Sequence, residues 1–207
     1  MRDKLGHVLK DAAQLYGAQV LGLVVGFGIS MVVARVLGAD GRGAYGWIMG
    51  LFMVAIPLGQ LGTDVVNRRV AATRPELAPV LAGNTVMQTL GWGSVVALGV
   101  YMVARGTPIG AAYPWALALA MVMLPLNMTH GLLGSVAAGL GKFKVVAGME
   151  IVQRLSMAAL VGVMLLTVQL DVVHLLVAQG IALLGGLAFV GWHMVRLAGW
   201  PWRGNVG

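Results

Sequence analysis

The sequence contains no cysteine and few acidic residues, and both shortages restrict the chemistry available to the protein. The absence of cysteine excludes disulfides, thiolate nucleophiles and cysteine-ligated zinc sites. Only seven aspartate and glutamate side chains occur in 207 residues, so carboxylate-rich metal sites and catalytic carboxylate pairs have few candidate members. Charged residues make up 10% of the chain, against about 25% in soluble domains. Such a chain has too little polar surface to coat a water-soluble globule.

Apolar residues are abundant instead, at 59% of the chain without counting its 31 glycines, and the mean hydropathy is +0.87. They form long runs, and a helix of about 20 apolar residues crosses a bilayer while satisfying its own backbone polar groups. We therefore expect an all-α integral membrane protein, a bundle of six transmembrane helices. The expected spans cover residues 15–36, 45–61, 80–104, 114–134, 145–168 and 172–195.

The 14 basic residues, which give a net charge of +7, are divided unevenly between the expected loops. Six spans place both termini on one side, together with ten of the bases; Arg35, Arg42 and Arg105 fall on the opposite side, and Arg154 lies inside span five. The excess of bases marks the cytoplasmic side. We expect cytoplasmic segments at residues 1–14 and 196–207 around a lobe of residues 15–195 in the inner (cytoplasmic) membrane. Because the bases form no patch, a nucleic acid partner is not expected.

Three segments between the spans combine glycines with basic residues, and two of them also contain aromatic residues. ARVLGADGRGAYGW (34–47) closes span one, turns through glycines and re-enters the membrane; GQLGTDVVNRRVAA (59–72) follows span two, and GLGKFKVVAGMEIVQR (139–154) follows span four. In order, spacing and placement they resemble the polysaccharide flippase branch of the multidrug/oligosaccharidyl-lipid/polysaccharide (MOP) exporter superfamily. The resemblance covers about residues 8 to 195 and corresponds to the first of the two six-helix lobes of that family.

This resemblance implies a transporter that flips a polyprenyl-diphosphate-linked oligosaccharide across the membrane for cell-surface polysaccharide synthesis such as that of O-antigen. The headgroup is expected in a polar, cationic cavity, because arginine binds diphosphate through planar bidentate donors. The expected partners are the lipid-linked sugar, membrane lipids, and a C-terminal lobe or a second copy. The chain is accordingly expected to be a fragment or a half-size transporter.

Glu150 and Arg154 are the main candidates for substrate contact. They lie four residues apart on one face of span five, so they can pair with each other. An arginine near the membrane centre costs about 2.5 to 3.5 kcal/mol on insertion scales and is a functional hypothesis by default. The pair also lies only six to ten residues from the basic Lys144, and a snorkelling or structural ion pair fits equally well.

The other candidates are polar residues near the ends or on one face of a span. Arg68 and Arg69 fit either contact with an incoming diphosphate or contact with lipid phosphates as topology determinants. For the amide, acidic and histidine side chains, both interhelical hydrogen bonding and cavity lining are open. They are Gln60, Asp64 and Asn67, which continue span two, Asn84 and Gln88 on span three, and Asn127 and His130 on span four. Arg35, at the outer end of span one, fits either a release path or anchoring of the hairpin.

Enzyme activity is not expected. A rhomboid-like protease needs glycine two residues before its serine, but Leu133 precedes Ser135 at that distance. The aspartates are scattered, and no nucleotide fingerprint or metal-spaced histidine pair occurs, so no cofactor or metal is expected. Two other functions remain open. One is a MOP-type exporter of cationic drugs, and the other is a non-transporting assembly subunit of a polysaccharide synthesis complex.

Overall fold

The computed structural model describes the backbone of residues 2–198 and the side chains of residues 17, 20 and 22–196. This part of the chain is helical and contains no strand, which confirms the all-α class. The elements are α1 (Arg2–Gln60), α2 (Thr63–Thr73), the short 3-10 turn η1 (Pro75–Leu77), α3 (Ala78–Arg105), α4 (Pro108–Ala112), α5 (Pro114–Gly139), α6 (Phe143–Thr167) and α7 (Val172–Ala198). The side chains of the expected segment 1–14 and the tail beyond residue 198 lie outside the described residues.

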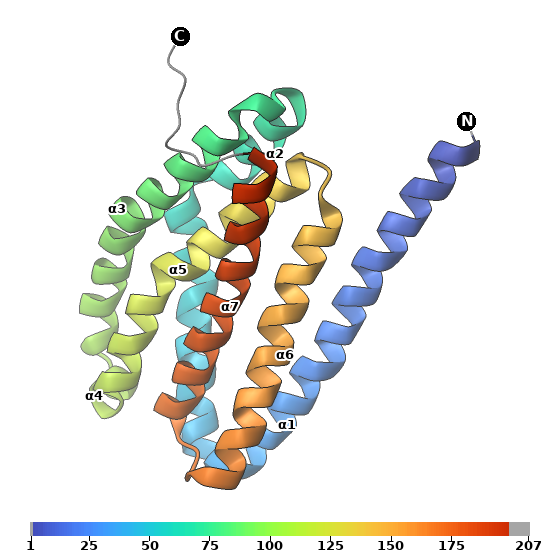
Figure 1. Cartoon of the computed structure of the whole chain (residues 1–207). Helices are drawn as coiled ribbons and strands as arrows, with labels where there is room; N and C mark the ends of the chain where they lie inside the picture. Colours follow the sequence, from blue (N-terminus) through green and yellow to red (C-terminus); the bar gives the residue numbers. More distant parts are fainter. Residues whose placement is uncertain (1, 199–207) are drawn as a thin grey trace.

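Five of the described helices are long and apolar enough to cross a membrane, which fits a multi-pass membrane protein. The expected count of six is not matched helix for helix, because α1 contains both of the first two expected spans. Alanine, arginine and leucine around the turn are strong helix formers, so helical geometry continues almost up to the turn itself. The ribbon of α1 descends from the N-terminus and then rises again (Figure 1). We call residues 22–37 the first arm and residues 39–60 the second arm.

Gly38 makes the reversal between the two arms. Its backbone has φ 67° and ψ −170°, which is not helical. Glycine adopts positive φ readily because it has no Cβ. A second break follows the second arm, where Gly62 has φ 75° and separates α1 from the polar helix α2. The expected polar continuation of span two is therefore a separate helix.

Helix α5 is the centre of the bundle. It contacts α1, α2, α3, α6 and α7, and 67% of its apolar window is buried, against 11% in α1 and in α6. In Figure 1 it lies between α3 and α7, while α6 and the first arm stand to one side. The outer helices therefore present most of their apolar surface to lipid.

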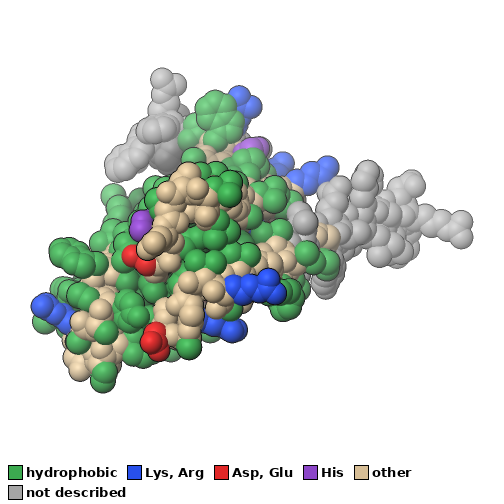
Figure 2. All heavy atoms as spheres, turned by 90° about the horizontal axis from the view of Figure 1, so that it is seen from below, with side chains coloured by type: hydrophobic (Ala, Val, Ile, Leu, Met, Phe, Trp, Pro, Cys, Tyr) green, Lys and Arg blue, Asp and Glu red, His purple; other side chains and the backbone are tan. Residues whose placement is uncertain are grey.

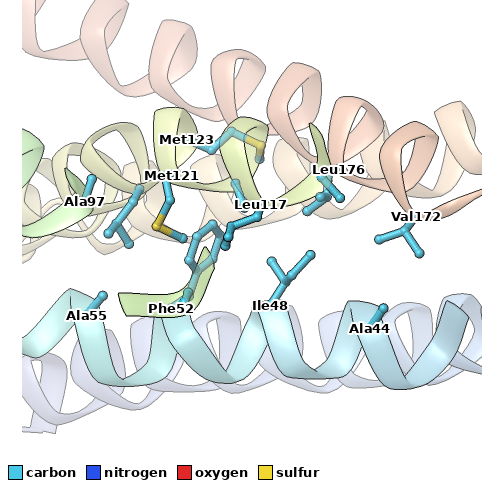
Figure 3. Close-up of a cluster of buried hydrophobic side chains, with 14 of the residues drawn as sticks. Ala44, Ile48, Phe52, Ala55, Ala97, Leu117, Met121, Met123, Val172 and Leu176 are labelled. Carbon is cyan, nitrogen blue, oxygen red and sulfur yellow. The ribbon is translucent and has the colours of Figure 1, made fainter. Parts of the chain in front are cut away.

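A cluster of apolar side chains joins the second arm to this central helix. Ile48 and Phe52 point from the arm toward Leu117 and Met121 of α5 (Figure 3), and all four are at most 5% exposed. Lipid tails are as apolar as these side chains, so their burial gains little from the hydrophobic effect. Close van der Waals contact must therefore supply much of the packing energy.

Polar contacts add to this packing at the junction of α2, α3 and α5. The hydroxyls of Thr89 and Thr129 are 2.6 Å apart and connect α3 with α5. The Asn67 amide donates to the Thr85 hydroxyl at 3.0 Å and connects α2 with α3. These are interhelical hydrogen bonds of the kind that stabilise membrane bundles.

The contact between α2 and α5 makes a stability prediction at Gly139. A Cβ at this position would lie 2.8 Å from Ala71 Cβ and would collide with the backbone carbonyl of Arg68. Gly139→Ala should therefore force the two helices apart, at a cost of about 1–3 kcal/mol for overpacking and a fall in Tm of roughly 2–12 °C. The measurement is the melting temperature of the purified full chain in detergent.

Gly162→Ala is the matched control, because nothing lies within 4 Å of a Cβ at that position of α6. This variant should keep or slightly raise the Tm, since alanine favours helix more than glycine does. Equal melting temperatures for Gly139→Ala and the unchanged chain would show that α2 and α5 do not approach each other this closely.

Candidate functional site

A cavity of about 570 Å³ lies between the two arms of α1, α6 and α7. It contains the polar side chains of both arms and of α6 and α7 on an otherwise apolar wall. Its lining residues are Val25, Gly26, Ile29, Ser30, Val33, Arg42, Tyr45, Gly46, Met49, Glu150, Gln153, Arg154, Met157, Gln179 and Ala182. This volume is in the range typical of sites for small organic ligands.

Helical periodicity brings these side chains to one space. Arg42, Tyr45 and Met49 are spaced at i, i+3 and i+7 along the second arm, so they share one face. Glu150, Gln153, Arg154 and Met157 follow the same rule on α6. Polar residues inside a membrane avoid lipid, and the shared face lets them all point toward the cavity.

Glu150 and Arg154 form an ion pair in the cavity wall. Arg154 Nη2 donates to Glu150 Oε2 at 3.5 Å, and each side chain is 40% exposed. Arg154 is the twelfth of the 25 residues of α6, about 16 Å from the start of that helix. The guanidinium therefore lies near the middle of the span. It remains partly accessible from the cavity.

Gly22 of the first arm leaves the space that this guanidinium occupies. A Cβ at Gly22 would lie only 2.5 Å from Arg154 Cζ. The first arm therefore approaches Arg154 so closely that no side chain fits between them. This contact fixes the arginine between the arm on one side and Glu150 on the other.

A hydrogen bond connects the second arm with α7 toward the end of the cavity that lies nearer Gly38. The Tyr45 hydroxyl donates to Gln179 Oε1 at 2.9 Å, and Gln179 Nε2 donates to Met49 Sδ at 3.7 Å. Arg42 precedes Tyr45 by one turn on the same face, and its side chain is exposed. Among the described residues it forms no ion pair.

Most of the other polar candidates from the sequence lie away from this cavity. Asn67 is bonded to Thr85, and Gln88 donates to Thr63 Oγ1 at 2.9 Å and toward the Gln60 carbonyl at 3.5 Å. Asn127 donates to the carbonyl of Met123 in its own helix. Four further candidates have exposed side chains: Arg35, Arg68, Arg69 and Asn84. The side chain of Asp64 is partly exposed. The structure therefore brings only Glu150 and Arg154 of the candidate set to the cavity.

His130 is the exception among the buried candidates. It is 6% exposed, and its Nε2 has no hydrogen-bond partner among the described residues. The atom lies against α7, where a Cβ at Gly186 would be 2.9 Å from it. Gly186 is one turn beyond the cavity residue Ala182, so His130 lies directly behind the cavity wall.

Five polar cavity residues were not identified from the sequence: Ser30, Arg42, Tyr45, Gln153 and Gln179. Gln153 could have been predicted from the sequence, because it shares the helix face of Glu150 and Arg154. Gln179 could also have been predicted, because it is a single amide side chain within the apolar run of α7. Arg42 falls between the first two expected spans and Tyr45 begins the second one, so their common helix face was not expected.

No group of three histidine, aspartate or glutamate side chains suited to a metal occurs in the searched part of the chain, the residues that the structure describes. Among the described residues, the charged side chains that line the cavity are those of the Glu150–Arg154 pair and Arg42. This arrangement can bind polar or anionic groups by charge and hydrogen bonding.

The fold is that of a multi-pass helical membrane protein, and a partly polar cavity lies between its helices. The sequence model of the polysaccharide biosynthesis protein family matches residues 8–203. The chain therefore belongs to this family, that of the MOP-superfamily polysaccharide and lipid-linked oligosaccharide flippases, whose members are transporter-like rather than enzymes. No curated protein and no solved structure matches the chain.

The absence of cysteine allows a direct test of whether water enters this cavity. Single cysteines at Ser30 or Gln153 should react with a charged maleimide in nanodiscs, because a thiol reacts as the thiolate, which forms in water. Cysteines at Leu155 or Val163, whose exposed side chains do not line the cavity, should react at least about tenfold more slowly in lipid. The measurement is the labelling rate followed by mass spectrometry. Equal rates at all four positions would contradict a hydrated cavity.

Proposed function

We propose that this chain forms one lobe of a flippase that moves polyprenyl-diphosphate-linked oligosaccharides across the inner membrane for cell-surface polysaccharide synthesis. The observation that carries the proposal is the polar cavity around Glu150 and Arg154 in a member of the polysaccharide biosynthesis family. An ionisable pair near the middle of a span costs free energy of membrane insertion, so its presence there suggests a function. Contact with a polar headgroup during its passage provides that function.

The chemistry of the cavity suits such a headgroup. A diphosphate and sugar hydroxyls both lose hydrogen bonds to water when they enter a membrane, and this loss is expensive unless replaced. Arg42 and Arg154 offer charged donors, while Gln153, Gln179 and Tyr45 offer neutral donors and acceptors. Glu150 adds a carboxylate acceptor for hydroxyl groups. The cavity therefore replaces both kinds of lost contact.

The lipid tail stays outside the cavity in this proposal. Leu23, Val24 and Phe27 of the first arm are 65–70% exposed and face away from the bundle. Hydrocarbon chains can lie along this apolar surface while the headgroup is in the cavity beside it. Arg68 and Arg69 of α2, whose side chains are exposed, are the proposed contacts for an incoming diphosphate at the cytoplasmic end of the bundle.

Alternating access requires a second half that closes over the cavity from the opposite side. The described cavity is partly open, and its walls come from the two arms, α6 and α7. A C-terminal lobe or a second copy of the chain is the proposed partner. Membrane lipids are the remaining partners of the apolar outer faces.

The cavity favours this function over export of cationic drugs. Its wall contains two arginines and one glutamate, so its charge is net positive and repels cations. The further possibility, a non-transporting assembly subunit, makes no use of a hydrated intramembrane site. A translocation assay distinguishes this possibility from transport.

Arg154→Gln should slow translocation of a fluorescent polyprenyl-diphosphate sugar by at least about tenfold, because it removes a charged donor from the headgroup path. Glu150→Gln should slow it less, since the arginine remains. The measurement is the accessible fraction of the probe in proteoliposomes that contain the chain alone or with its second lobe.

Arg105→Gln is the matched control, because Arg105 is exposed at the end of α3 and does not line the cavity. Its rate and its membrane abundance should match those of the unchanged chain. If Arg154→Gln lowered abundance and rate equally, the ion pair would be structural. If the unchanged chain moved no probe in either form, the transport function would be lost and an assembly subunit favoured.

The proposed orientation places both termini and the α5–α6 loop in the cytoplasm. A green fluorescent protein fused after Lys142 should therefore fluoresce, and alkaline phosphatase fused after Gly106 should be active outside. These positions lie at opposite ends of the bundle, between α5 and α6 and after α3. The measurement is the pair of reporter activities in whole cells, and the reverse pattern would invert the proposed topology.

A further inference from the structure

The two arginines of the cavity differ in how their charge is compensated. Arg154 is paired with Glu150 on the same helix and is held against Gly22. Arg42 forms no ion pair with any residue that the structure describes, and its side chain is exposed. Only Arg42 therefore contributes an uncompensated positive charge to the cavity.

The two arginines also lie at different depths. Arg42 is four residues beyond the turn at Gly38, whereas Arg154 is thirteen residues before the end of α6 at Thr167. That turn and the end of α6 lie at the same end of the bundle (Figure 1). The difference of nine residues corresponds to roughly 13 Å along the helices. Tyr45 and Gln179 lie between the two levels.

The end of the bundle near Arg42 has few charges. Seen from that end, hydrophobic side chains form a large part of the described surface, and a few charged side chains lie among them (Figure 2). A base at this level lies close to the phosphates of the bilayer surface, whereas Arg154 lies near the middle of its span. A diphosphate is therefore accommodated at the level of Arg42 with its lipid tail still in the bilayer.

Charge decides which arginine suits the diphosphate. A diphosphate beside Arg154 would also lie beside the carboxylate of Glu150, and the two anions repel each other. Arg42 can offer its full guanidinium fork to phosphate oxygens. Glu150, Gln153 and Arg154 together provide one carboxylate acceptor and several donors, which matches the hydroxyl groups of a sugar.

We propose that Arg42 binds the diphosphate of the lipid-linked sugar, while Glu150, Gln153 and Arg154 bind hydroxyls of the sugar. This assignment rests on the proposed flippase function and names the part of the substrate that each end of the cavity takes. Arg42 sets the requirement for a diphosphate. The α6 residues set the preference for a sugar.

The phosphate of an ordinary phospholipid has the same chemistry as the diphosphate for a single arginine. The experiment therefore uses the full chain in phosphatidylcholine nanodiscs with three probes. These are a polyprenyl diphosphate without sugar, the same lipid with one sugar attached, and phosphatidylglycerol. The measurement is the Kd of each probe for the unchanged chain, Arg42→Gln, Arg154→Gln, Glu150→Gln and the control Arg105→Gln.

Arg42→Gln should weaken binding of the sugar-free polyprenyl diphosphate by about tenfold or more, as expected for loss of a charge-assisted contact. Arg105→Gln should leave that Kd within about twofold, a difference of under 1 kcal/mol. Glu150→Gln and Arg154→Gln should bind the sugar-free lipid nearly as well as the unchanged chain. Both should lose most of the additional affinity that the attached sugar confers.

Two results would overturn the assignment while leaving the transport function intact. One is loss of sugar-free diphosphate binding in Arg154→Gln but not in Arg42→Gln. The other is an equal loss of phosphatidylglycerol and polyprenyl diphosphate in Arg42→Gln, which would make Arg42 a general lipid anchor. If the unchanged chain bound neither polyprenyl lipid, the proposed function itself would fail and the assignment with it.

Discussion

In a hydrocarbon solvent every backbone polar group has to be bonded inside its own helix, and apolar side chains gain little by leaving lipid for protein. The bundle therefore depends on close packing and on a small number of polar contacts between helices. Helix α5 illustrates both, because it is the most buried of the long described helices and bonds to α3 through the Thr89 and Thr129 hydroxyls. The outer helices α1 and α6 are much less buried than α5. Their apolar faces already have a suitable solvent, so nothing draws them further into the core.

The same constraint separates the polar residues of the chain into two kinds. Asn67 and Gln88 donate hydrogen bonds to side chains on neighbouring helices, and these bonds connect the helices. The polar cavity residues are only partly satisfied by one another, as the long 3.5 Å contact between Arg154 and Glu150 shows. Polar groups that keep unused donors inside a membrane require water or a ligand. The cavity therefore differs from the rest of the bundle because some of its polar side chains lack hydrogen-bond partners.

Local patterns in the sequence predicted the helices well but not the contacts between them. The expected starts at residues 114 and 172 coincide with those of α5 and α7, since proline and a preceding polar loop mark them. Glu150 and Arg154 could be paired because four residues on one helix fix their distance. The bond between Tyr45 and Gln179 joins residues 134 positions apart, and only the docking of α7 on the second arm brings them together. The position of Arg42 in the cavity wall was not predicted because the turn is confined to Gly38, so a residue expected in a loop lies on a helix face.

The positions of the charges in the cavity follow from what the membrane permits. A lone arginine near the middle of a span is expensive, whereas one that is paired with a carboxylate has lost much of its net charge. At the end of the bundle water and lipid phosphates are close, so Arg42 can remain charged without a protein partner. A free charge at the end and a compensated charge near the middle is therefore an arrangement that is stable before any substrate binds. In the proposed orientation, an anionic headgroup from the cytoplasmic side would pass the compensated pair near the middle, which is no strong anion trap, before it reached the attractive charge of Arg42 at the outer end of the bundle.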